Sequence, residues 1–384
     1  MRRTNLYLVA LSALALATGC SSDETTSENY GEAISFSAVA GKSSRAVATT
    51  TNSIDNFKVY AFTKASTADD AAYTTYMKGV DVTKSNGSWD YSNHQFWPAT
   101  AVNFFAVSPS NTALATVTDG ANTLSTGTYT VDGTTDLLYS ANVGATKSTS
   151  PVVMNFRHAL SQIVFMVKNT NTSGIKVMVK DITVDGVLNS GSLAWASQTT
   201  GSNLTTTTND TETGNTWGTW TVGTTKSSYT VSADAAFELT STATYVKSAD
   251  GDNGALFLLP QTLTEWNKLG GESSNNGSRL LVNCQIVDAT SGIQLWPASG
   301  EYANVAIPLP NPTSDPCKTD ADPHERWMQG KQYVYTIAFG EGGGYNPDPD
   351  PDDNPDPVLV PISFDVTVDV FQDGGSYDVD AATN

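Results

Sequence analysis

Two residues near the start of the chain, Cys20 and Arg45, have types and surroundings suited to covalent chemistry. Arg2 and Arg3 precede an apolar run that ends at Gly19-Cys20, which is typical of a secretory signal. The run is too short to span a bilayer. We expect the Cys20 thiol to accept a diacylglycerol and to become the N-terminus after cleavage of the signal. The alternative is an ordinary signal peptide with an incidental cysteine.

Arg45 lies in a stretch of small residues, where it would be accessible to an Arg-specific protease. Upstream, Ile34, Phe36 and Ala38 alternate with serines and predict a short amphipathic strand. Cleavage after Arg45 would release this strand with the lipid, make Ala46 the first residue, and leave an apolar groove beside an unpaired sheet edge. The residue pattern alone favours the alternative, a spacer without structure in which Arg45 has no role.

A second amphipathic strand is predicted in the tail, where residues on one face are apolar and those between them are polar. Its apolar residues are Ile362, Phe364, Val366, Val368 and Val370. Burial of five such side chains contributes about 7–15 kcal/mol, more than the strand at 34–38 can offer. A glycine hinge and an extended Pro/Asp spacer precede the tail. The tail could therefore reach another molecule, or it could fold back as the last strand of its own domain.

The rest of the chain consists of short alternating segments separated by Asn-Gly and Asp-Gly turns, which indicates an all-β sandwich fold. The clearest segments are 56–62, 102–107, 163–167 and 333–337. The one candidate for helical structure is a turn at 156–160, after which the pattern restarts. The predicted divisions are a signal peptide at 1–19, a propeptide at 20–45, β-sandwich domains at 46–160 and 161–340, a spacer at 341–357 and a tail at 358–384.

The composition argues against nucleic acid as a partner. Thirty-nine acidic residues against 20 basic ones give a net charge of -19, and phosphate binding needs a basic face. The three histidines, His94, His158 and His324, belong to no catalytic motif, and His158 is expected to be a hydrogen-bonded structural residue. We expect neither enzymatic activity nor a cofactor.

The remaining cysteines and acidic turns have ordinary structural explanations. Cys284 shares one side of a predicted strand with Val282 and Ile286, so it is expected in the core. Cys317 lies in a Pro/Asp loop, and a disulfide between the two cysteines is left open. The turn at 250–254 lacks the full ligand spacing of a calcium loop, so no metal site is predicted.

The order of several motifs resembles that of the fimbrillin family, the subunits of lipoprotein-derived pili (type V-like) of Gram-negative anaerobes. The motifs lie at 33–38, 44–46, 57–62, 96–98, 102–109, 155–163, 258–263 and 330–337. The resemblance implies two tandem transthyretin-like β-sandwich domains. The serine and acid run at 21–24 is similar to the signal that sends such lipoproteins to the outer face of the outer membrane.

The resemblance also implies a mode of assembly. The N-terminal strand is removed at an arginine, here Arg45, and the vacated groove is filled by the C-terminal strand of a neighbouring subunit, here about 362–371. The implied partners are other pilus subunits, an Arg-specific surface protease and, before cleavage, the outer membrane through the lipid; the product is a cell-surface fimbrium that supports adhesion. The long spacer leaves the register of the donor strand open. The alternative is a surface lipoprotein that binds glycan or a host protein without polymerising.

Overall fold

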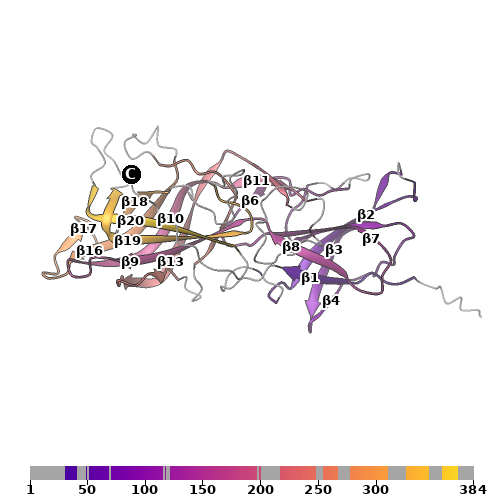
Figure 1. The fold of residues 1–384 in the computed structure, drawn as a ribbon, viewed down its shortest axis with the longest axis horizontal. Helices are drawn as coiled ribbons and strands as arrows, with labels where there is room; N and C mark the ends of the chain where they lie inside the picture. Colours follow the sequence, from indigo (N-terminus) through magenta and orange to yellow (C-terminus); the bar gives the residue numbers. More distant parts are fainter. Residues whose placement is uncertain are drawn as a thin grey trace, which may run out of the picture.

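The computed structural model describes residues 31–40, 49, 52–68, 71–115, 117, 122–196, 199, 217–247, 254–266, 277–309, 326–345 and 357–370, with 341–345 and 357–370 as backbone. Every regular element in these ranges is a β-strand, so the predicted all-β class is confirmed (Figure 1). Within the same ranges, no helix is long and apolar enough to cross a membrane.

Seven strands form the first sheet. Their bounds are β1 (Phe36–Ala40), β2 (Asn56–Lys64), β3 (Tyr73–Ser85), β4 (Ser88–Asp90), β5 (Val102–Ser108), β7 (Leu138–Ala145) and β8 (Val152–His158). The spatial order is β1-β8-β7-β5-β2-β3-β4. All neighbouring strands are antiparallel except β1 and β8, which are parallel. Strand β1 is thus a parallel strand at the edge of an otherwise antiparallel sheet.

Ten strands form the second sheet. They are β9 (Ser161–Asn169), β10 (Ile175–Leu188), β13 (Lys226–Glu238), β14 (Thr244–Tyr245), β15 (Leu256–Leu258), β16 (Arg279–Asp288), β17 (Gln294–Trp296), β18 (Ala303–Pro308), β19 (Lys331–Tyr345) and β20 (Pro357–Val370). The main path is β13-β10-β16-β18-β19-β9-β14, and β15, β17 and β20 pair with β9, β16 and β19. A small third sheet contains β6 (Tyr129–Thr130), β11 (Ser190–Ala194) and β12 (Thr219–Val222).

The middle of the first sheet is covered on both faces. All seven residues of β5 are buried. Phe104 and Ala106 face a smaller hydrophobic cluster drawn from residues 34–156, whereas Phe105 and Val107 face a larger cluster that extends to residue 339. Alternate side chains of one strand therefore join two cores. Figure 1 shows β1–β4, β7 and β8 gathered at one end of the molecule and most of the second sheet at the other.

The helical turn predicted at 156–160 is wrong. Residues 156–158 are the end of β8, and 159–160 connect this strand directly to β9. Val152, Met154 and Phe156 point alternately into the smaller core, which fixes an extended backbone. Arg157 and His158 obscured this pattern in the sequence, because both are polar and yet buried.

Candidate strand-exchange site

Strand β1 lies along the outer edge of β8. Its five residues pair in parallel with Val152–Phe156, beginning with Phe36 opposite Val152 and ending with Ala40 opposite Phe156. The amide of Val152 also donates a hydrogen bond to the Ser35 carbonyl, at 2.8 Å. Because β1 has a neighbouring strand of this sheet on one side only, it can leave without breaking the rest of the ladder.

The residues just before β1 are held by a different segment. The amide of Ile34 donates to the carbonyl of Gln95 (2.8 Å), and the amide of Trp97 donates to the carbonyl of Glu32 (3.0 Å). An antiparallel bridge joins Ala33 to Phe96 between them. Removal of residues 32–40 would therefore leave backbone groups without their partners on β8 and on the 95–97 segment.

The apolar side chains of this N-terminal strand are part of the smaller core. Ile34, Phe36, Ala38 and Ala40 are all buried, and Phe36 is only 4% exposed. The Phe36 ring lies among three other rings, with centroid distances of 5.5 Å to Tyr91, 5.6 Å to Phe104 and 6.2 Å to Phe57. The Tyr91 hydroxyl donates to the Ile34 carbonyl at 2.8 Å. Without the strand, this aromatic site and the backbone donors beside it would form an open groove.

The sequence identified three of the four buried side chains. Ile34, Phe36 and Ala38 were predicted to face a groove, and the structure places all three in the core. Ala40 was missed, although it continues the same alternation, because a lone alanine is a weak apolar signal. A period of two does not specify a partner strand, so the alternation alone could not predict that β8 lies beside this one.

The chemistry predicted before and after this strand falls largely outside the described residues, which include neither Cys20 nor Arg45 and Ala46. The next described residue is Thr49, whose amide donates a hydrogen bond to the Asp136 carboxylate at 2.8 Å. Asp136 in turn contacts the His158 ring at 3.0 Å, and both side chains are only 4% exposed. His158 is thus a hydrogen-bonded structural residue, as predicted, and it helps to hold the chain shortly after Arg45.

The segment predicted as the donor strand, 362–370, does form a strand, β20, and within the isolated chain this strand pairs with β19. Strand β20 runs antiparallel to β19, from Lys331 opposite Val370 to Phe339 opposite Ile362, and less regularly beyond. On its other side β19 pairs in parallel with β9. Of the predicted spacer (341–357), residues 341–345 belong to β19 and Pro357 to β20, so the glycine segment is strand in this structure, and 346–356 lie outside the described residues. Of the two possibilities raised by the sequence, the structure therefore has the tail folded back.

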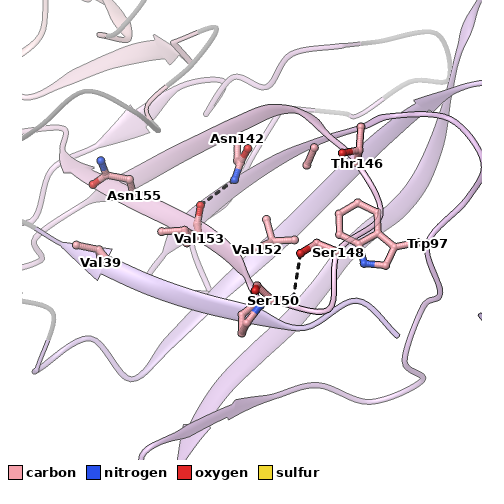
Figure 2. Close-up of a pocket in the computed structure, with 11 residues that line it drawn as sticks. Val39, Trp97, Asn142, Thr146, Ser148, Ser150, Val152, Val153 and Asn155 are labelled. Atoms are coloured by element: carbon pink, nitrogen blue, oxygen red, sulfur yellow. Dashed lines mark hydrogen bonds between the residues drawn. The ribbon is translucent and has the colours of Figure 1, made fainter. Parts of the chain in front are cut away.

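A shallow pocket lies on the outer face of the sheet, beside β1. It has a volume of about 530 Å³, and Figure 2 shows Trp97 at one end and the side chain of Asn142 donating to the Val153 carbonyl (3.0 Å). Val39 and Val153 line it and are 42% and 44% exposed. None of the lining residues is ionisable, so the pocket offers a contact surface but no acid or base.

The described residues contain no group of three or more His, Cys, Asp or Glu side chains that could hold a metal ion. Cys284 is a free thiol in the core, and burial raises its pKa to about 12. A thiol with such a pKa is a poor nucleophile. Cys317, His324 and most of the acidic turn at 250–254 lie outside the described residues, whereas His94 is exposed and contacts Asp90 at 2.8 Å.

Comparison with known families identifies the family to which this chain belongs. The model of the fimbrillin-like family matches residues 44–350, so the chain belongs to this family. The match begins one residue before Arg45, and both β1 and β20 lie outside it.

Two solved structures illustrate the likeness. A fimbrial protein from Bacteroides vulgatus is 16% identical, with 87% of this chain and 98% of that chain covered and a TM-score of 0.48. A fimbrilin from Porphyromonas gingivalis is 10% identical, with 89% and 98% covered and a TM-score of 0.41. No curated protein matches the chain.

Proposed function

We propose that this chain is a structural subunit of a cell-surface fimbrium. In this proposal the precursor is exported to the outer membrane as a lipoprotein on Cys20 and is cut after Arg45 by an Arg-specific surface protease. The tail strand of one subunit then fills the groove that residues 32–40 leave in the next. The role is structural and adhesive, with no enzymatic activity and no cofactor.

The observation that carries the proposal is the position of β1. Together with Ile34 just before it, this strand contributes four buried side chains to a core, yet it is a sheet edge and is joined to the rest by a segment that contains Arg45. If this strand is removed, the core loses buried side chains and β8 loses its partner, so another strand has to take its place. Membership of the fimbrillin-like family supports this use of the strand.

The tail meets the requirements for the replacement. It forms a strand of its own, β20, whose sequence alternates apolar and polar residues, and a Pro/Asp spacer precedes it. Strand addition at an open edge supplies backbone hydrogen bonds, and the alternating side chains fill pockets. Because the donating and accepting surfaces differ, such a contact propagates into an open filament.

One observation favours a second function. Strand β20 already pairs with β19 of the same chain over most of its length. A tail that stayed there would leave a surface lipoprotein that binds glycan or a host protein as a monomer. The shallow apolar pocket beside β1 could then serve as a contact surface.

Deletion of the tail distinguishes the two functions. The full chain and a chain lacking residues 358–384 are each treated with an Arg-specific protease and run on a detergent gel without boiling. The fimbrial proposal expects a ladder of oligomers from the full chain and none from the deletion. A mixture in which the deletion variant is in excess should give short oligomers, because this variant can accept but not donate. Equal ladders from both chains would remove the tail as the donor, and the absence of a ladder from the matured full chain would favour the second function.

A further inference from the structure

The two strands that are proposed to exchange share a sequence. Ile-Ser-Phe occurs at 34–36, at the start of the N-terminal strand, and again at 362–364 in β20. The alternation continues in both, with Ala38 and Ala40 in the first strand and Val366 and Val368 in the second. The tail thus repeats the apolar pattern of the strand that it would replace.

We propose that this repeat sets the register of the exchange. In the neighbouring subunit, Ile362 takes the position of Ile34, Phe364 that of Phe36, and Val366 and Val368 those of Ala38 and Ala40. The donor therefore runs parallel to β8 of the acceptor, as β1 does. This inference rests on the proposed function and specifies how the partner binds the groove.

The aromatic site explains why the register is unique. The position of Phe36 is enclosed by the rings of Tyr91, Phe104 and Phe57, so it fits one aromatic side chain. Phe364 is the only aromatic residue on the apolar face of 362–370. A slip by two residues would put Ile362 or Val366 among the three rings. A slip by one residue would turn the polar face inward.

The positions of the two alanines explain why the tail can displace the strand it resembles. Ala38 and Ala40 lie opposite Met154 and Phe156 of β8, and all four side chains belong to the smaller core. Valine at these positions buries more apolar surface than alanine. Met154 can adapt to the larger neighbour because its side chain is unbranched and flexible.

The outward positions agree with the same alignment. Asp365 and Thr367 would replace Ser37 and Val39 on the face that is open to solvent. Val39 lines the outer pocket in Figure 2, so exchange would place a threonine there. Asp365 would lie opposite Val153, as Ser37 does in the precursor.

Cysteine pairs at these outward positions measure the register. Val153→Cys is combined with Asp365→Cys, Ser363→Cys or Thr367→Cys, each in a full chain that carries Cys317→Ser. In the folded precursor Asp365 pairs with Thr336, so it is not beside Val153 before exchange. As the matched control, Ser37→Cys with Val153→Cys in the uncleaved chain joins two residues that are already partners. Polymer formation is followed separately by electron microscopy under reducing conditions.

After cleavage and mild oxidation, the proposal expects a covalent ladder from the Asp365→Cys chain, about tenfold stronger than from the two slipped chains, because disulfides tolerate only a narrow range of Cα separations. Two results would overturn the register alone. In the first, the polymers form, but Ser363→Cys or Thr367→Cys gives a stronger covalent ladder than Asp365→Cys. In the second, the polymers form and the precursor control forms its disulfide, but none of the three chains gives a covalent ladder. Absence of polymers from the matured chains, with or without the substitutions, would overturn both the register and the fimbrial function.

Discussion

The Phe36 ring meets the Phe104 ring edge-on, with centroids 5.6 Å apart and planes at 83°. The first ring belongs to a strand proposed to be lost, whereas the second belongs to β5, whose residues reach both cores. The strand that is proposed to be lost is therefore packed directly against a strand that would remain. This contact makes the stability of the precursor depend on its own N-terminal strand.

Replacement of Phe36 should measure that dependence. Truncation of a buried phenylalanine removes its packing and leaves a cavity, so Phe36→Ala should lower the free energy of unfolding of the uncleaved precursor by about 3–5 kcal/mol. Val39→Ala on the same strand is the matched control, since Val39 is exposed and the change should stay within about 0.5 kcal/mol. Urea unfolding measures both values. Equal effects would mean that β1 is not packed as described.

Replacement of Arg45 should block maturation. Arg45→Ala should leave the precursor uncut, so that residues 32–40 stay in place and no subunit can accept a donor. Lys42→Ala is the control, because it removes the nearest other basic residue and keeps Arg45. N-terminal sequencing of the surface form should find Ala46 first in the wild type and in Lys42→Ala. A surface form of Arg45→Ala that still began at Ala46 would contradict the assignment.

Replacement of Cys20 should abolish attachment to the membrane. Cys20→Ala removes the thiol that would carry the diacylglycerol, so the precursor should leave the membrane fraction and take up no labelled fatty acid. Cys317→Ser retains Cys20 and should fractionate as the wild type does. Persistent membrane association of Cys20→Ala would point to another anchor.

The buried thiol predicts a dependence of stability on pH. Burial raises the pKa of Cys284 to about 12, whereas an unfolded cysteine titrates near about 8.5. Above the lower pKa the unfolded chain binds fewer protons than the folded one, so the free energy of unfolding falls as the pH rises between the two values. Cys284→Val should show a smaller fall between pH values of about 8 and 10 in urea unfolding. An identical fall in both proteins would show that the thiol titrates alike in both states.

The strand pattern of this chain could be predicted because most strands bury one face. Segment 56–62 alternates and lies within β2, whereas 163–167 is a continuous apolar run within β9, where most residues are buried. The pattern failed at 156–160, where Arg157 and His158 are buried polar residues whose partners come from distant parts of the chain. The Asp136 carboxylate beside His158 is one of them. Sequence periodicity cannot identify such partners.

The site was predictable to a similar extent and for the same reason. Alternation revealed the amphipathic strands at 34–38 and 362–370, because each presents one apolar face. It did not reveal that β1 is parallel to β8 or that β20 pairs with β19. An apolar face has to be buried, but it does not determine which strand lies beside it. Those pairings depend on the remainder of the fold.

The burial of β1 within a core has a consequence for the lifetime of a filament. A subunit held by surface contacts alone can dissociate while it stays folded. A donor strand seated where β1 sits would instead be part of the acceptor's hydrophobic interior, beside Phe57 and Phe104. Its escape would require the acceptor to open its core, so the rate of filament breakage would follow the rate of local unfolding. Such a filament would persist, because the contact between two subunits could break no faster than the acceptor subunit unfolds locally.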